Sequence, residues 1–352
     1  MRTGRATAAR RRWTITEHWT PPVFVPALHA GHAPSHDFSD GYPPVPYPEV
    51  PQRVEAVLHG LQRIWPAQPI EVAGQALEAV RALHDADYVE FLLAIAETLQ
   101  PGDEYIPTVF HPDLGGAPLR HRGGMYCAEI GSPLVAGTVE AALCSAAAAV
   151  AAAEAVAESG EDAIALCRPP GHHAGRRRWG GYCLFNNAYL AAHRLAAAGI
   201  CPVLDVDYHL GDGGLEFASE QAPYFSLHAD PWRNYPHLDA RAGREAGPGA
   251  LVVLPRDTDD AEYLELLDPV LARIDSLEPT ALVVSLGFDI ATGDGIQDDP
   301  VHIGPEGFHT LGRRIGRRPF PVVVLLEGGY DLEALPERAA DFFAGLRDGR
   351  AD

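Results

Sequence analysis

The chain reads VLDVDYH over residues 203–209, an apolar, β-branched stretch that continues into three side chains of the kinds that bind metals. Such a stretch is typical of a strand that is buried in a parallel sheet. Because alternate residues of a strand face the same side, Asp205, Asp207 and His209 can converge on one point. Two buried carboxylates repel each other unless a cation lies between them. The run therefore predicts a buried strand that ends at a divalent-metal site.

Outward from this run, short apolar segments alternate with helical stretches. The pattern predicts strands at 163–167, 202–207, 224–228, 250–254, 281–286 and 321–326, and helices at 51–64, 86–99, 137–160, 183–199, 260–275, 305–316 and 332–346. This alternation is typical of a parallel sheet with helices on both faces. We predict one α/β domain over residues 13–352 after a disordered tail at 1–12. Proline-rich entrance loops and the first helices would occupy 13–136, and the metal-site core 137–346.

Polar side chains follow most of the predicted strands where each strand ends. They are Pro169-Pro170-Gly171-His172-His173, the run ending at His209, Ser226 with His228, Gly287-Phe288-Asp289, and Glu327-Gly328-Gly329-Tyr330. In open parallel sheets, ligands bind beyond the carboxyl ends of the strands. Taken singly, Asp289 would be a helix cap and Tyr330 a half-buried aromatic residue. Five such strand ends together predict a functional site.

The composition narrows the choice of partners. The chain has 48 acidic and 27 basic residues and a formal net charge of −21, which argues against nucleic acid. All basic residues are arginine, which excludes a mechanism based on a lysine Schiff base. The five cysteines form no C-x-x-C pair, and no uninterrupted apolar run is long enough to span a membrane. We therefore expect a cytoplasmic protein with reduced thiols and no membrane partner.

Six segments resemble the histone deacetylase / acetylpolyamine amidohydrolase family. They are CRPPGHHAG (167–175), GGYCLFNNAYLAA (180–192), VLDVDYHLGDG (203–213), FSLHADP (225–231), VVSLGFD (283–289) and LLEGGYD (325–331), in the family's order and spacing. Upstream, HAPSHDF…PEVPQRVEAVL (32–58), LHDADYVEFL (83–92) and GTVEAALCSA (137–146) look most like the acetylpolyamine branch. The resemblance implies an arginase-like fold with a central, mainly parallel eight-stranded sheet, and it suggests a homodimer.

By this resemblance, Asp207, His209 and Asp289 would bind the catalytic metal and leave positions open for water and the substrate carbonyl. Zinc (Zn²⁺) is the family's default ion, and this hard donor set also suits Fe²⁺, Co²⁺ or Mn²⁺. A structural potassium ion (K⁺) would be bound by Asp205, Ser226 and main-chain oxygens of Asp207, His209 and Leu227.

The same resemblance assigns the acid–base groups. His173 would activate water and then protonate the leaving amine, and His172 would stabilise charge. Asp205 and Asp212 would orient the two imidazoles. Tyr330 would donate a hydrogen bond to the oxyanion. A narrow apolar tunnel for a linear acylated amine would be lined by Gly181, Tyr182 and Tyr235.

Three functions are compatible with these residues. The first is a metal-dependent amidohydrolase that removes acetyl or other acyl groups from small amines such as acetylpolyamines. The second is a deacetylase acting on acyl-lysine in proteins or peptides, which needs a shallow, open rim. Segments 20–51 and 101–125 are long enough to restrict the mouth, which favours small substrates. The third is a non-catalytic metal- or ligand-binding relative, and the histidine pair with Tyr330 counts against it.

Two features of the expected mouth depart from the acetylpolyamine branch. Gly131 stands where the branch has an acidic residue, and Glu129 lies two residues earlier. Arg176, Arg177 and Arg178 follow the tandem histidines, where guanidinium groups facing the entrance would repel a polyamine. Solvated loop arginines are the more ordinary interpretation. Both features weaken the expectation of polyamine specificity.

Overall fold

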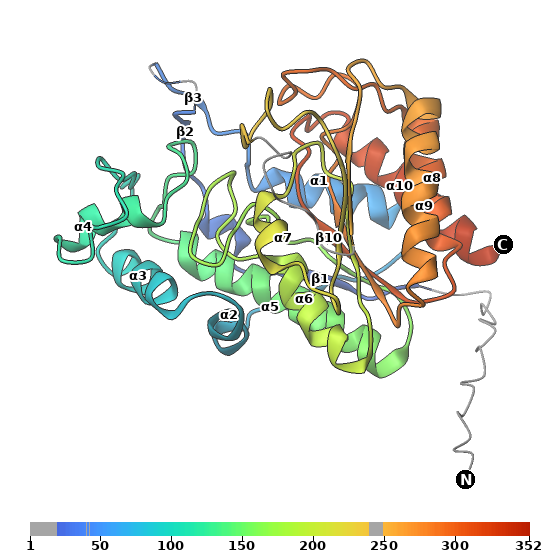
Figure 1. The fold of residues 1–352 in the computed structure, drawn as a ribbon, viewed down its shortest axis with the longest axis horizontal. Helices are drawn as coiled ribbons and strands as arrows, with labels where there is room; N and C mark the ends of the chain where they lie inside the picture. Colours follow the sequence, from blue (N-terminus) through green and yellow to red (C-terminus); the bar gives the residue numbers. More distant parts are fainter. Residues whose placement is uncertain (1–19, 40, 42, 239–248) are drawn as a thin grey trace, which may run out of the picture.

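The computed structural model of the chain describes residues 20–39, 41, 43–238 and 249–352. The tail predicted over residues 1–12 lies outside the described residues. An eight-stranded sheet runs through the middle of the molecule, with helices on both faces (Figure 1). Neighbouring strands in this sheet pair in parallel throughout. The predicted α/β class with a mainly parallel eight-stranded sheet is therefore confirmed.

The sheet has the strand order β4-β1-β5-β10-β9-β6-β7-β8. Its strands are β1 (Val23–Pro26), β4 (Ile70–Val72), β5 (Ala163–Ala165), β6 (Val203–Asp205), β7 (Tyr224–His228), β8 (Ala250–Val253), β9 (Leu282–Leu286) and β10 (Val322–Leu326). A separate antiparallel pair joins β2 (His36–Asp37) to β3 (Val45–Pro46). The sequence pattern did not predict β1 and β4, because each is short and lies in the proline-rich first part of the chain.

The helices are α1 (Gln52–Gln62), α2 (Leu77–Leu83), α3 (Ala86–Ala96), α4 (Leu119–Arg122), α5 (Thr138–Ser159), α6 (Asn187–Leu195), α7 (Asp212–Phe217), α8 (Asp260–Ser276), α9 (Pro305–Gly316) and α10 (Leu335–Ala351). Helix α6 begins later than the predicted 183–199, because the Asn186 side chain caps it by accepting from the main-chain N–H of Tyr189 at 3.0 Å. The other predicted helices agree within three residues at each end, except that α10 ends five residues after the predicted 332–346.

Two hydrophobic layers cover the sheet, one on each face. Leu204 and Val284 pack into the layer formed with α1, α8, α9 and α10. Their strand neighbours Val203 and Val283 pack into the opposite layer, against α5 and α6. Figure 1 shows these two groups of helices on opposite sides of the sheet. Because successive strand residues face opposite layers and both layers are apolar, the strands read as continuous hydrophobic runs.

Helix α5 is, among the described residues, the one helix long and apolar enough to cross a membrane by length and composition. However, 67% of its most apolar window is buried inside the protein. The helix contacts β1, β5 and α6, and its many alanine side chains allow close approach to the sheet. Its apolar character is therefore explained by its place in the core.

Candidate metal and acid–base site

The predicted metal ligands meet at the carboxyl ends of two adjacent strands, β6 and β9. The ligand atoms of Asp207, His209 and Asp289 all lie within 4.8 Å of one another, and all three residues are buried. His209 Nδ1 lies 3.2 Å from both Asp207 Oδ1 and Asp289 Oδ2. Asp205 is not part of this group, contrary to the convergence that the spacing suggested. The physical reason is that β6 ends at Asp205, so the alternation of side chains does not extend to Asp207 and His209.

The chemistry of this trio fits a divalent cation. Burial raises the pKa of Asp289 to about 7, and the neighbouring carboxylate of Asp207 acts in the same direction. Asp289 Oδ2 is buried and makes no hydrogen bond. A Cβ atom at Gly287 or Gly328 would collide with both carboxylates, so glycine lets the main chain pass close to them. A bound cation would offset the repulsion between the two acids.

Each tandem histidine is bound to its own carboxylate. His172 Nδ1 lies 3.1 Å from Asp205 Oδ2, and His173 Nδ1 lies 2.8 Å from Asp212 Oδ1. Burial alone would lower the pKa of His172, but the charges of Asp207 and Asp205 raise it well above 6.5. Burial and the adjacent charge of His172 lower the pKa of His173 to about 3. The two histidines therefore lie in unequal electrostatic environments, which raise the pKa of His172 and lower the pKa of His173.

Glu327 holds the histidine loop against the sheet. Its Oε2 accepts hydrogen bonds from the main-chain N–H groups of Gly171 at 2.7 Å and His172 at 3.1 Å, and its Oε1 accepts from Ser285 Oγ at 2.9 Å. His172, Cys183 and Glu327 also have metal-ligand atoms within 4.8 Å of one another. Because both Glu327 oxygens already accept hydrogen bonds, we interpret this residue as one that holds the loop in place and not as a metal ligand.

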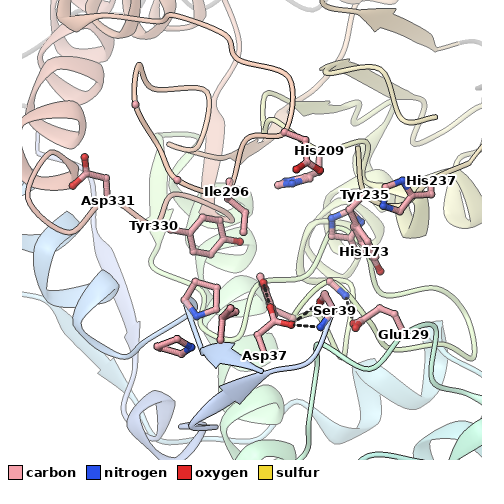
Figure 2. A pocket seen from close by; sticks show the side chains of 18 residues that line it. Asp37, Ser39, Glu129, His173, His209, Tyr235, His237, Ile296, Tyr330 and Asp331 are labelled. Carbon is pink, nitrogen blue, oxygen red and sulfur yellow. Dashed lines mark hydrogen bonds between the residues drawn. The ribbon is translucent and has the colours of Figure 1, made fainter. Parts of the chain in front are cut away.

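Tyr330 enters the site on the loop that follows β10. The main chain of this loop is fixed by two buried acids, since Gly328 N–H donates to Asp207 Oδ2 at 2.8 Å and Tyr330 N–H donates to Asp294 Oδ2 at 2.7 Å. Figure 2 shows the Tyr330 hydroxyl pointing into the space bordered by His173 and His209. Burial raises the pKa of the phenol well above 10, so the hydroxyl stays a hydrogen-bond donor.

A buried arginine supports Tyr330 from behind, and the sequence pattern did not reveal it. Arg53 Nε donates to Gly329 O at 2.5 Å, and its guanidinium carbon lies 4.8 Å from the centroid of the Tyr330 ring. Glu49 Oε1 accepts from Arg53 Nη1 at 2.7 Å and from Arg168 Nε at 2.9 Å. Glu49 and Arg53 belong to the PEVPQR segment quoted above. Its resemblance to the acetylpolyamine branch was the sequence signal that could have pointed to these two residues.

A pocket of about 660 Å³ opens over these groups. The predicted tunnel residues Gly181, Tyr182 and Tyr235 all line it, together with His173, His209 and Tyr330. Part of segment 20–51 also lines the pocket, as expected for an entrance loop, through residues between Asp37 and Pro48. Segment 101–125 contributes no described residue to the lining. It supports the entrance loop indirectly, because Glu104 Oε2 lies 2.9 Å from His36 Nδ1.

Two acids, the buried Asp37 and the half-buried Glu129, line the pocket. Asp37 Oδ2 accepts from the Tyr182 hydroxyl at 2.6 Å. Glu129 Oε1 accepts from Ser132 Oγ at 2.5 Å and from Gly181 N–H at 3.0 Å, and its Oε2 accepts from Gly131 N–H. A side chain at residue 131 would collide with Asp37 and Glu129. Glu129 therefore brings a carboxyl group to the wall although residue 131 is glycine.

Two of the three loop arginines, Arg177 and Arg178, form ion pairs with acids. Arg177 pairs with Asp87, and Arg178 pairs with Asp212 and Glu216. The Arg176 side chain instead donates to the main-chain oxygen of Glu216 and lies over the Phe217 ring. Arg178 is only 26% exposed, so the expectation of a solvated loop arginine is wrong for this residue. The ion pairs of Arg177 and Arg178 reduce the repulsion that these two guanidinium groups would exert on a cationic substrate.

The residues predicted to bind potassium lie on adjacent strands. Asp205 of β6 is opposite Ser226 of β7 in the sheet register. Asp205 Oδ2 also accepts from the Tyr224 hydroxyl at 2.5 Å, and Ser226 Oγ lies 2.8 Å from His228 Nδ1. Within the described part of the chain, no hydrogen bond reaches the main-chain oxygens of Asp207 and His209. These oxygens are therefore available to a cation.

This parallel sheet, with buried polar groups at the carboxyl ends of its central strands, has the arginase-like α/β fold. The chain belongs to the histone deacetylase domain family, whose family model matches residues 47–346. The resemblance seen in the sequence is thereby confirmed.

Two curated relatives are acetylpolyamine amidohydrolases. The protein from Burkholderia pseudomallei (strain 1710b) is 35% identical over 334 residues, which are 90% of this chain and 95% of that protein. The protein from Mycoplana ramosa is 34% identical over 322 residues, 86% of this chain and 93% of that protein. A crystal structure of acetylpolyamine aminohydrolase from Burkholderia pseudomallei gives a TM-score of 0.86 at 31% identity, covering 94% and 99% of the two chains. These similarities support an amidohydrolase of the deacetylase type.

Proposed function

We propose that the chain is a divalent-metal-dependent deacetylase that hydrolyses the amide bond of small acylated amines such as acetylpolyamines. The observation that carries this proposal is the arrangement of the ligand trio, the tandem histidines and Tyr330 around one pocket. A binding protein would need the ligands but not an acid–base pair beside them. The geometry therefore favours catalysis over a purely metal-binding role.

Asp207, His209 and Asp289 would hold the cation, with Zn²⁺ as the first candidate and Fe²⁺, Co²⁺ or Mn²⁺ as alternatives. The cation would supply Lewis-acid chemistry, lowering the pKa of water and polarising the acyl carbonyl. A K⁺ ion between Asp205, Ser226 and the main-chain oxygens of Asp207, His209 and Leu227 would stabilise the ends of β6 and β7, beside two of the metal ligands.

The acid–base roles follow from the unequal histidines. The lowered pKa of His173 favours its uncharged form, and Asp212 holds its Nδ1, so its Nε2 would accept a proton from water and later return it to the leaving amine. His172 would keep its proton and stabilise the negative charge that develops nearby. The Tyr330 hydroxyl would donate a hydrogen bond to the carbonyl oxygen as it becomes an oxyanion.

The acidic wall favours small cationic amines as substrates. Asp37 and Glu129 line the pocket, and Asp298 and Asp331 add two further acids to its lining. A polyamine that carries an acyl group at one end retains ammonium groups, which these carboxylates would attract. An acyl-lysine in a protein or peptide is the second candidate, because its side chain is also a linear acylated amine.

The test is an activity panel that compares acetylated polyamines, acetyl-lysine peptides and amines with longer acyl chains. It is run on the protein loaded in turn with zinc, iron or cobalt. We expect kcat/KM for the acetylated polyamines to exceed that for the peptides by at least about tenfold, a difference of ~1.4 kcal/mol in transition-state binding. A higher kcat/KM for the peptides would favour the acyl-lysine function. Hydrolysis of none of these amides would refute the proposed activity.

A substitution in the acidic wall tests the cationic part of the substrate. Asp37→Asn keeps an oxygen for Ser39 and a polar group for Tyr182. We expect KM for a cationic substrate to rise about fivefold with kcat unchanged, because one carboxylate contributes ~1 kcal/mol of attraction.

The control for this experiment is Glu265→Gln on α8, which removes the same charge from an exposed position. It should leave KM unchanged. If Asp37→Asn raised KM equally for an uncharged acyl substrate, the effect would be structural and the electrostatic role of Asp37 would be wrong.

A further inference from the structure

We propose that Arg178 is a positioning residue for the acid–base pair, acting on His173 through Asp212. The inference rests on the proposed function for the role of His173. Asp212 is fully buried, and each of its oxygens has a separate partner. Oδ1 lies 2.8 Å from His173 Nδ1, and Oδ2 accepts a charge-assisted hydrogen bond from Arg178 Nη1. A carboxylate held at both oxygens cannot rotate away from the imidazole.

Arg178 is itself held from two sides. Its Nη2 donates to Glu216 Oε1 at 2.9 Å, and Glu216 lies on the same short helix, α7, as Asp212. Residues four apart on a helix share one face, so a single guanidinium group can bridge both acids. The guanidinium fork is rigid and planar, which fixes Asp212 in a way that a flexible ammonium group would not.

The loop that follows the tandem histidines turns back and brings Arg178 beside Asp212. Arg178 follows His173 by five residues, and the loop closes where Gly175 N–H donates to Arg178 O at 3.0 Å. Glu216 Oε2 accepts from Arg176 N–H at 2.8 Å, and a Cβ at Gly175 would collide with Glu216. One short segment therefore carries both the base and the group that fixes its partner.

The charge of Arg178 also keeps Asp212 ionised. Burial opposes ionisation, but the hydrogen bond with His173 and the charge of Arg178 together lower the pKa of Asp212. An ionised Asp212 accepts the His173 Nδ1 proton, which leaves the Nε2 lone pair for the pocket. Arg178 would therefore act on catalysis without touching the substrate.

The kinetic test compares Arg178→Ala with Arg177→Ala, its neighbour on the same loop. Arg177 is paired with the exposed Asp87 and has no contact with Asp212 among the described residues. We expect Arg178→Ala to lower kcat about 10- to 100-fold with KM unchanged, as for other groups that orient a histidine. Arg177→Ala should retain wild-type kcat. Metal content and thermal midpoint are measured on each variant to show that site and fold are intact.

Two rescue experiments distinguish a positioning role of Arg178 from a structural defect in the Arg178→Ala variant. Arg178→Lys should recover part of the lost kcat, because it restores the charge without the fork. Added guanidinium should raise the kcat of Arg178→Ala, since Arg178 borders a cavity of about 510 Å³ that would admit the ion. Equal losses in the two alanine variants, or no response of Arg178→Ala to either rescue, would overturn the inference.

An NMR measurement tests the role of Arg178 without relying on turnover. In metal-free protein, the His173 Nδ1 proton shared with Asp212 should give a downfield ¹H resonance, identified by its loss in Asp212→Asn. This resonance should disappear or broaden in Arg178→Ala and persist in Arg177→Ala. If the wild type hydrolysed no amide, the proposed function would fail, whereas this resonance would still decide the role of Arg178. An unchanged resonance in Arg178→Ala would overturn that role.

Discussion

Tyr330→Phe should lower kcat by about 10²- to 10³-fold while the protein still binds its metal, as expected when one oxyanion donor is removed. The substitution deletes only the hydroxyl group. The aromatic ring would keep its contact with Arg53, and the main chain would keep its hydrogen bond to Asp294. Because the hydroxyl acts chiefly on the developing oxyanion, KM should change far less than kcat.

Tyr182→Phe is the matched control, because this tyrosine lines the same pocket and its ring lies 5.9 Å from that of Tyr330. Its hydroxyl is bound to Asp37 rather than directed at the reacting groups. Steady-state kinetics and metal analysis on both variants decide the role. A Tyr330→Phe protein with the kcat of the Tyr182→Phe protein would remove Tyr330 from the mechanism.

Asp289→Ala should abolish stable metal binding and, with it, activity. The substitution removes one of the three proposed protein ligands, and the remaining carboxylate and imidazole would form an incomplete site. Elemental analysis after dialysis should find a full equivalent of metal on the wild type and nearly none on the variant. Because a ligand that binds the folded state raises its stability, added metal should raise the thermal midpoint of the wild type but not of the variant.

Asp294→Asn provides the control for metal binding. Asp294 is a buried acid in the same loop as Asp289, but it accepts from the main-chain N–H of Tyr330 instead of joining the ligand trio. This variant should retain its metal even if its activity falls. Retention of a full equivalent by Asp289→Ala would show that the proposed ligand set is wrong.

Much of the fold was predictable from the sequence because its central strands are buried on both faces. A strand such as β10 lies between two apolar layers and is apolar at every position, which makes it visible as a continuous hydrophobic run. Strands β1 and β4 were not predicted, since three or four residues among prolines provide no periodic pattern. The alanine-rich α5 was predicted because its run is long and ends at Gly160.

The candidate site was predictable where its residues follow strands in sequence. The ends of β5, β10, β9 and β6 are neighbours in the sheet, so residues that follow these strands meet at one edge. The supporting residues were not predictable in this way. Arg53 reaches the Tyr330 loop from α1, and a buried arginine in a helix has no distinctive sequence pattern.

The run at residues 203–209 shows most clearly which features depend on the local sequence and which depend on the tertiary structure. Its sequence determined that a buried strand carries ligand-type groups to the edge of a parallel sheet, because apolar β-branched residues and their period are local properties. Only the tertiary structure decided that Asp205 turns to His172 while Asp207 and His209 join Asp289, and that Arg178 reaches Asp212. These choices depend on where the strand ends and how distant segments approach one another, and a local pattern contains neither.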